Sequence, residues 1–282
     1  MQINRDLRRK VVNCLKFLVG CMITIIVVSP LLITFFAAFK SPMDMVTVSP
    51  LMLPPLENIT FDNIIEVAKE ESLPYAVKNV LIILGVSIFF NIMIGSATAY
   101  VLERFDFRFK KIIYAMFFAG MMVPTAITEI ARFEVIHSMK LYNTLGAPIV
   151  IYIASDLMQL YIYRQFISKI SVSLDESARI DGASYFTVFR KIIFPLLAPA
   201  TSTLIIIKSV NIINDMYIPY LYMPGSKLKT LTTFLMGYAG AESGSWQKLS
   251  AAVLLILIPT FIIYIAFQSK IVDGLSAGAV KE

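Results

Sequence analysis

The residue types that catalysis needs are scarce in this 282-residue chain, and they do not occur at catalytic spacings. His137 is the only histidine, so a histidine-based metal site or acid–base pair would rest on a single side chain. The metal-binding pattern HExxH, the pattern CxxC and the phosphate-binding pattern GxxxxGK are absent. We therefore expect no catalytic residues, no metal site and no resident cofactor, and we expect that the chain does not hydrolyse nucleotides itself.

Polar residues inside an apolar stretch are the strongest candidates for ligand binding, because charges within a membrane span are rare and usually functional. Lys208, Asn211 and Asp215 are spaced i, i+3 and i+7, which places them on one helix face, with Asn214 close by. This face could line a path for a polar substrate. It could equally join helices through a salt bridge, to Asp156 or to an acid of a partner. Both interpretations stay open from the residues alone.

A second polar group interrupts another apolar stretch. Glu129, Arg132 and Glu134 can pair along one helix end, and Pro124 can kink the same span. We interpret this group as structural.

A charged segment, DESARIDGASYFTVFRKIIFP, runs from Asp175 to Pro195 between two apolar stretches. Ser173 and Glu176 have capping-box spacing, which predicts the start of a short helix. Gly182, just after Asp181, can adopt the left-handed conformation that ends such a helix. The sequence therefore predicts a short helix that ends in a glycine turn.

A second short helix should follow this turn. Ser184 can cap its start, and Phe186, Phe189 and Ile193 recur on one face at i, i+3 and i+7. Pro195 should limit its continuation. The segment is then a pair of short helices with one apolar face.

Two interpretations of this pair remain. An amphipathic helix can lie in the lipid headgroup region. However, Asp175, Glu176 and Asp181 outnumber Arg179, and an anionic membrane surface does not favour that balance. A turn that presents small residues and acids is better suited to docking on a partner protein.

The elements around these residues are apolar helices. Hydrophobic residues make up 57% of the chain and charged residues only 16%, well below the usual quarter of a soluble domain. A spanning helix needs about 20 mostly apolar residues. We predict an all-α, polytopic membrane protein with six spans, near 17–39, 77–102, 112–135, 147–165, 198–222 and 249–268.

The positive charges predict the orientation. With the N-terminus in the cytoplasm, 16 of the 25 Lys and Arg residues lie on the cytoplasmic side and eight on the outer side. This places residues 1–16 and the tail 269–282 in the cytoplasm, with the loop 171–195 between the fourth and fifth spans on the same side. The outer loop 40–76 should contain a short helix around 61–70. The net charge of +6 therefore follows membrane topology and does not indicate nucleic-acid binding.

The loop 171–195 resembles a motif of a known family. Glu176-Ser177-Ala178, then Asp181-Gly182-Ala183, then Pro195 at the end of an apolar stretch resemble the EAA loop of ABC-importer permeases. Ser177 replaces the second alanine of that pattern. The remainder of the chain looks like the maltose-type carbohydrate branch of this family, in MMVP from Met121, in NDM from Asn214 and in the tail GLSAGAVKE. The likeness covers nearly all 282 residues as one transmembrane domain.

The resemblance implies a function as half of a translocation path for a carbohydrate, expected to be an oligosaccharide, in the bacterial cytoplasmic membrane. It implies a second, related permease, two ATPase subunits that bind ATP and Mg, and an extracytoplasmic solute-binding protein. The residues that would couple to the ATPases are Glu176, Ser177, Ala178, Asp181, Gly182 and Ala183. The residues that would meet sugar hydroxyls are Lys208, Asn211, Asn214 and Asp215.

The main alternative is an ion-coupled secondary transporter that uses Lys208 and Asp215. Such transporters are often built from inverted repeats, and the sequence shows no sign of one. We therefore favour the ATP-driven importer.

Overall fold

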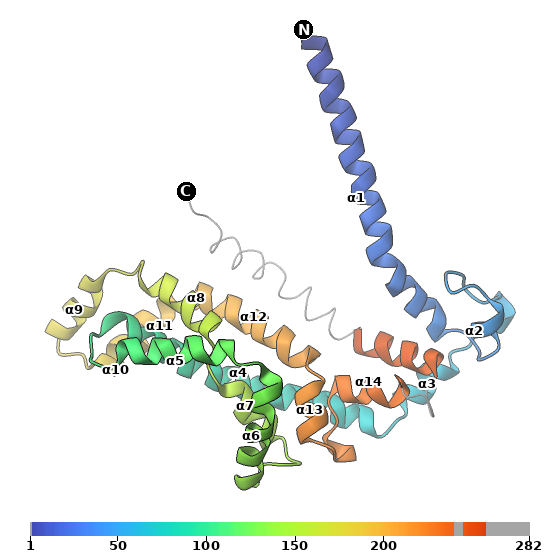
Figure 1. Ribbon diagram of the computed structural model, residues 1–282. Coiled ribbons are helices and arrows are strands. Elements are labelled where there is room, and N and C mark those ends of the chain that lie inside the picture. Colours follow the sequence, from blue (N-terminus) through green and yellow to red (C-terminus); the bar gives the residue numbers. More distant parts are fainter. Residues whose placement is uncertain (1, 240–244, 258–282) are drawn as a thin grey trace. The chain divides into compact units, whose positions relative to one another are not determined.

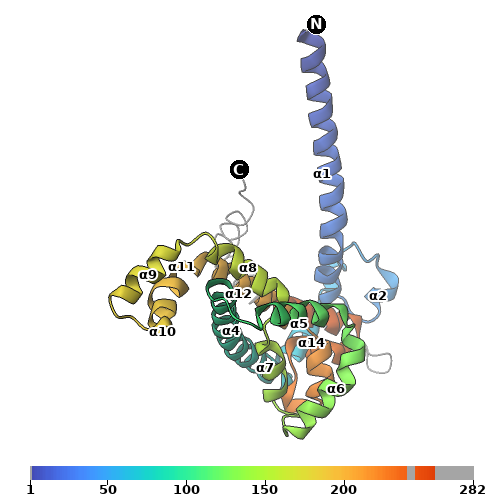
Figure 2. The ribbon, with the colours of Figure 1, turned by 60° about the vertical axis from the view of Figure 1, so that its left-hand side comes forward.

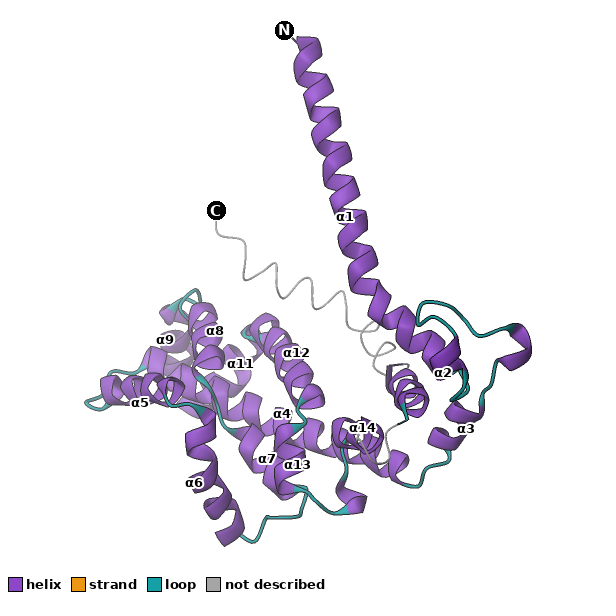
Figure 3. Ribbon diagram, turned by 45° about the vertical axis from the view of Figure 1, so that its right-hand side comes forward, coloured by secondary structure: helices purple, strands orange, loops and turns teal. Residues whose placement is uncertain are grey.

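The structure is a computed structural model that describes residues 2–239 and 245–257, and every regular element within those ranges is helical (Figure 3). The chain forms two compact units. Unit 1 comprises the residues up to Leu73 and those from Leu235, and unit 2 contains Pro74–Phe234. The two units are described separately.

Unit 1 begins with one long helix, α1 (Gln2–Ala38; Figure 1). Its most apolar 18-residue window contains no buried residue, and from Val12 onward only Ala37 and Ala38 at its end are buried. Pro30 lies inside it without breaking it. Proline leaves the carbonyl of Ile26 without its usual partner, and the hydroxyl of Ser29 donates to that carbonyl at 3.0 Å. Serine hydroxyls commonly satisfy such carbonyls in membrane helices, so α1 stays continuous.

The remaining helical elements of unit 1 are α2 (Asp44–Thr47), a 3₁₀ turn at Leu56–Asn58, α3 (Asp62–Ala68) and the segment Trp246–Leu257. The loop that follows α1 is folded onto the end of that helix. Asn63 of α3 donates to the carbonyls of Ala38 and Lys40, both at 3.0 Å. Lys40, only 1% exposed, donates to the carbonyl of Ser49 at 2.7 Å. The helix predicted around 61–70 is confirmed.

Unit 2 is a bundle of short helices around one long helix (Figure 2). The helices are α4 (Ser72–Arg104), α5 (Lys110–Met122), α6 (Thr125–Ser138), α7 (Gly146–Ile153), α8 (Leu157–Ile167), α9 (Val172–Ile180), α10 (Tyr185–Val188), α11 (Phe194–Leu196), α12 (Ala198–Asn214) and α13 (Tyr217–Tyr222). A π-helical turn, Phe189–Ile193, joins α10 to α11, a 3₁₀ turn covers Ser226–Leu228, and α14 (Leu231–Ala239) leads into unit 1.

Three of the predicted spans are broken helices rather than continuous ones. The span 112–135 divides into α5 and α6 before Pro124, as the predicted kink requires. The span 147–165 divides into α7 and α8, bent by 45°, because Asp156 caps the second helix. The span 198–222 divides into α12 and α13, because Asp215 leaves the helical conformation. The prediction that 147–165 and 198–222 are single helices is therefore wrong.

Two helices in the described ranges, Val12–Ala38 and Ser72–Arg104, are long and apolar enough to cross a membrane alone, and up to five spans result if each bent pair counts as one. The sixth predicted span, 249–268, extends past the described residues, and the tail 269–282 lies wholly outside them. The count of six and the orientation stay predictions.

The core of unit 2 is built on one face of α4. Ser87, Asn91, Gly95 and Ala99 recur every four residues on this face, and all are buried. Small residues at this spacing let membrane helices approach closely. At Gly95 the approach leaves no room, because a Cβ atom there would lie 2.2 Å from Nε2 of Gln159 on α8.

Candidate functional site

The segment Val172–Val188, here called the α9–α10 hairpin, lies at one end of unit 2 (Figures 1 and 2). Its first helix begins after Ser171, whose side chain accepts a hydrogen bond from the amide of Ser173. The predicted capping box of Ser173 and Glu176 is therefore wrong, because Ser171 has the extended backbone of a cap and Ser173 is already helical. Ser184 caps α10 as predicted and accepts from the amide of Thr187 at 3.2 Å.

Gly182 ends α9 as predicted, with a φ of +84° in the left-handed region. Its amide donates to the carbonyl of Arg179 at 3.1 Å, and the amide of Ala183 donates to that of Ala178 at 3.0 Å. Arg179 also donates from its guanidinium to the carbonyl of Ala183 at 2.9 Å. These bonds satisfy the last carbonyls of α9, so the turn has a defined shape.

The six residues of the predicted coupling set divide between two surfaces. Four are exposed on the outside of the hairpin: Glu176, Ser177, Asp181 and Gly182. Ala178 and Ala183 are half-buried and pack against the core of unit 2, so they are not presented at the surface with the others. Their small size lets the hairpin lie close to the core.

Two large apolar side chains accompany the exposed set. Ile180 is 86% exposed and Phe186 is 66% exposed, both beside the glycine turn. Of the predicted apolar face, Phe189 and Ile193 are buried in the core, whereas Phe186 is exposed. The single turn of α10 extends beyond the core, and only its last residue, Val188, reaches it. An exposed apolar pair rimmed by acids is the kind of surface that a partner protein covers.

Pro195 limits the second helix as the sequence predicts, because the helix that starts at Tyr185 ends one residue later, at Leu196. The π-helical turn Phe189–Ile193 precedes Pro195, which lies inside α11. The direction changes two residues later, at Leu197, where the chain bends by 74° into α12. A π turn allows the helix to accommodate the missing amide, and such turns are frequent at functional sites.

Asp175 lies on the inner side of α9, 9% exposed, and its two carboxylate oxygens both meet α4. The hydroxyl of Tyr100 donates to Oδ1 at 2.8 Å. Nε of Arg104 lies 3.2 Å from Oδ2, an ion pair whose atoms are not aligned for a hydrogen bond. Sequence reasoning counted Asp175 among the surface acids and missed these partners, which lie more than 70 positions earlier.

A second ion pair joins the same end of α4 to α8. Nε of Arg164 donates to Oε2 of Glu103 at 2.7 Å. The guanidinium also lies 4.8 Å from the centre of the Tyr114 ring on α5. Three helices of unit 2 are thus joined at this end.

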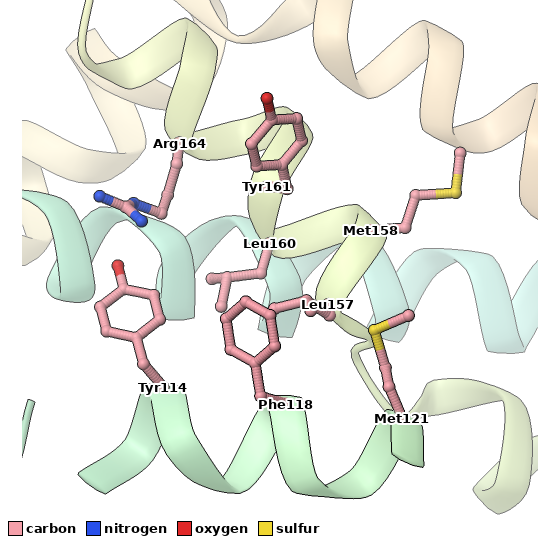
Figure 4. A pocket seen from close by; sticks show the side chains of 8 residues that line it. All are labelled: Tyr114, Phe118, Met121, Leu157, Met158, Leu160, Tyr161 and Arg164. Atoms are coloured by element: carbon pink, nitrogen blue, oxygen red, sulfur yellow. The ribbon is translucent and has the colours of Figure 1, made fainter. Parts of the chain in front are cut away.

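Beside this ion pair, α5 and α8 enclose an open groove of about 400 Å³ (Figure 4). Tyr114 and Arg164 lie at one end, and Met121 and Met158 at the other. The remaining lining residues are Phe118, Leu157, Leu160 and Tyr161. The groove is almost entirely apolar and contains none of the predicted site residues.

The predicted polar face of α12 meets the α7–α8 break. Lys208 forms an ion pair with Asp156, which is the salt bridge that the sequence allowed. Asp156 also caps α8, accepting from the amide of Gln159 at 2.8 Å. Asn91 of α4 completes this break, because its amide donates to the last carbonyls of α7, at 2.9 Å for Ala154.

Asp215 does not continue the face of Lys208 and Asn211, which corrects the spacing argument. It follows the end of α12 and caps α13, accepting from the amide of Tyr217 at 2.8 Å. Its other oxygen accepts from the hydroxyl of Tyr152 on α7 at 2.8 Å. Asn211 and Asn214 are exposed. The amides therefore remain accessible to a ligand, whereas both charges are engaged within the chain.

The polar group of α6, Glu129 and Arg132, joins two helices. Arg132 and Glu129 of α6 pair at 2.8 Å, as the sequence predicts. The hydroxyl of Tyr222 on α13, a fully buried side chain, donates to the other oxygen of Glu129 at 2.6 Å. Glu134 is exposed and takes no part in this group. These contacts join α6 to α13.

Comparison with solved structures identifies the class of fold. The chain superimposes on a bacterial ABC transporter involved in the import of the acidic polysaccharide alginate, with a TM-score of 0.80 and 17% identity over 92% of this chain and 96% of the other. A subunit of the MetNI methionine ABC transporter matches with a TM-score of 0.52 and 19% identity over 72% of this chain and 96% of the other. The fold is that of an ABC-transporter membrane subunit.

Sequence comparison gives the family. Residues 91–275 match the family described as "Binding-protein-dependent transport system inner membrane component". The melibiose/raffinose/stachyose import permease MelC of Bacillus subtilis is 33% identical over 79% of this chain and 82% of its own length. The probable starch-degradation-product permease AmyC of Thermoanaerobacterium thermosulfurigenes is 30% identical over 93% and 95%. The chain therefore belongs to this family of inner-membrane transport components and is a permease component rather than an enzyme.

Proposed function

We propose that this chain is the permease subunit of an ATP-driven importer for an oligosaccharide. The observation that carries the proposal is the α9–α10 hairpin, which combines a fixed inner side with an exposed outer side of acids, glycine and apolar residues. The relatives whose names include a sugar support a carbohydrate as the substrate class. The family membership supports an ATP-dependent engine outside this chain.

In this proposal the outer side of the hairpin docks on an ATPase subunit. Glu176, Ser177, Asp181 and Gly182 would contact the partner, and Ile180 would insert an apolar anchor beside them. ATP and Mg would bind to the two partner ATPase subunits, because this chain has no phosphate-binding pattern. Closure of the ATPases on ATP would then move the hairpin.

The translocation path would run along the exposed face of α12. Asn211 and Asn214 offer amides that both donate and accept hydrogen bonds, the chemistry that sugar hydroxyls need. The Lys208–Asp156 pair and Asp215 lie at helix breaks beside this face, so they would move when those breaks bend. A second, related permease would supply the other half of the path.

The remaining assignments follow from topology. We place the chain in the bacterial plasma membrane with six spans, both termini and the hairpin in the cytoplasm, and the loop 40–76 outside. The outer loops would receive a loaded solute-binding protein.

The decisive experiment uses the chain reconstituted in vesicles with the transport proteins encoded beside its gene. Uptake of radiolabelled raffinose, as the first of a panel of oligosaccharides, is measured with and without ATP, and again after proton and sodium gradients are collapsed. We expect uptake that requires ATP and survives the collapse. Uptake without ATP that disappears with the gradients would contradict the proposal and favour an ion-coupled transporter.

A further inference from the structure

We propose that Tyr100, Arg104 and Asp175, here called the α4–α9 joint, transmit the movement of the hairpin to the α7–α8 break through α4. This inference rests on the proposed function, because it assumes that a partner moves the hairpin. It assigns the transmitting residues, which are separate from those that would touch the partner.

Asp175 and Glu176 are neighbours on α9 but lie on different sides of it. Asp175 faces inward and is buried, whereas Glu176 is exposed. A force applied to the outer side of α9 therefore reaches the remainder of unit 2 through the inner side. Asp175 is the only acid of the described α9 residues that is buried there.

The connection between α9 and α4 is strong. The side chains of Arg104 and Asp175 are only 9% and 13% exposed. Removing one partner of a buried ion pair strongly destabilises the fold, because the other charge is left buried and unpaired. Nη2 of Arg104 also donates to the carbonyl of Ile170 at 2.7 Å, so the same guanidinium fixes the loop before α9. The hydroxyl of Tyr100 donates a hydrogen bond to the other oxygen of the carboxylate. The joint therefore holds α9 in one position relative to α4.

Both helices of the hairpin also lie at the same end of α4. Tyr185 of α10 makes an edge contact with Phe105, the residue after α4, with ring centroids 5.0 Å apart, and the ring of Tyr100 lies 5.5 Å from that of Phe189, the residue after α10. The hairpin and the cytoplasmic end of α4 should then move as one body.

Helix α4 is also continuous. It is an unbroken helix of 33 residues, whereas the three predicted spans that follow it are broken. Asn91 lies 13 positions before Arg104, roughly 20 Å along the helix axis at 1.5 Å per residue. Its amide donates to the carbonyls of Tyr152, Ile153 and Ala154, directly before the cap of α8. A shift of α4 therefore acts on the α7–α8 break, where Asp156 meets Lys208.

The test reports movement without a sugar. Asn211→Cys is introduced into a chain whose Cys14 and Cys21 are replaced by alanine, and the chain is purified with its ATPase subunits. The rate of labelling by a membrane-impermeant maleimide is compared with and without ATP plus vanadate. Asp175→Asn and Tyr100→Phe are the test variants. Asp106→Asn is the matched control, because that carboxylate lies nearby and is fully exposed.

We expect the ATP-dependent change in labelling to fall roughly 2- to 30-fold in Asp175→Asn, the range of coupling changes along packed networks, while the ATPase subunits still co-purify and hydrolyse ATP. Tyr100→Phe removes one hydroxyl and should give a smaller loss in the same direction, even if the aspartate variant folds poorly. The control should behave as the parent does.

Two outcomes overturn the inference alone. One is a parent-like response in both test variants, and the other is loss of the ATPase subunits from Asp175→Asn, which would make this residue a docking contact. A parent chain that neither binds the ATPases nor responds to ATP would instead overturn the proposed function.

Discussion

Gly95→Ala should destabilise unit 2, although alanine is the better helix former. The added Cβ would lie 2.2 Å from Nε2, 2.4 Å from Cδ and 2.8 Å from Oε1 of Gln159. The glutamine cannot move away freely, because it is fully buried and its Nε2 donates to the carbonyl of Asn91 at 3.0 Å. The substitution therefore forces overpacking and displaces the glutamine from this hydrogen bond.

The magnitude follows from these terms. Overpacking of a core costs about 1–3 kcal/mol, and a lost hydrogen bond adds about 0.5–1.5 kcal/mol. The helix preference of alanine over glycine returns about 1 kcal/mol. The free energy of unfolding should fall by roughly 2 kcal/mol in Gly95→Ala. Gly85→Ala is the matched control in the same helix, since a Cβ there meets nothing within 4 Å, and it should be neutral or stabilising by up to about 1 kcal/mol.

The assay is unfolding of the purified protein in mixed micelles, followed by the helical circular-dichroism signal as the fraction of denaturing detergent rises. The double variant Gly95→Ala/Gln159→Ala should lose less stability than the sum of its single variants, because Gln159→Ala removes the clash and the added methyl group fills part of the space that the glutamine leaves. Equal stabilities for the variants at Gly95 and Gly85, or strict additivity in the double variant, would refute the close contact of α4 and α8.

Three further predictions concern other contacts. Gly182→Ala should destabilise the hairpin turn by about 1–2 kcal/mol, with a smaller cost for asparagine, since only the positive φ opposes a side chain there; faster hydrogen exchange at the end of α9 would show it, and unchanged exchange would contradict it. Tyr222→Phe should cost about 1.5–3 kcal/mol in the unfolding assay, because a buried hydrogen bond to a carboxylate is lost, whereas Tyr220→Phe at an exposed ring should change nothing; equal effects would refute the assignment. The hydrogen bond from Ser41 lowers the pKa of Asp44 below 3.8, so this carboxylate stabilises its loop above that pH and the benefit is lost as the pH falls through the lowered pKa. The stability difference between the parent and Asp44→Asn should vanish in acid, and a difference that grows there would have the wrong sign.

The glycine turn and the start of α10 could be predicted because their determinants are local. Gly182 and Ser184 lie within a few residues of the turns that they form, so their types and spacing are sufficient. The partners of Asp175 could not be predicted in the same way. Tyr100 and Arg104 become its neighbours only when α4 and α9 pack together, and no local pattern distinguishes a buried acid from the exposed Glu176 beside it.

The two helix breaks at Asp156 and Asp215 are marked in the sequence by these acids. Asp156 and Asp215 looked like charges within continuous spans, and each is in fact a helix cap. Asp156 and Gln159 have the spacing of a capping pair, which would have indicated the start of α8. The ion pair of Lys208 with Asp156 was one of the alternatives that the sequence left open, because opposite charges in an apolar environment attract each other. Hydrophobicity alone cannot separate a bent pair of helices from one straight span.

The most direct measurement is site-specific cross-linking from the tip of the hairpin. Ile180→Cys, in a chain without Cys14 and Cys21, is labelled with a photoreactive maleimide and irradiated in the purified complex. We predict a cross-link to the ATPase subunit, and none from Met139→Cys, another exposed position, directly after α6. A cross-link from Met139 instead, or none from Ile180 although the ATPase is present, would contradict the claim that this hairpin couples the permease to its engine.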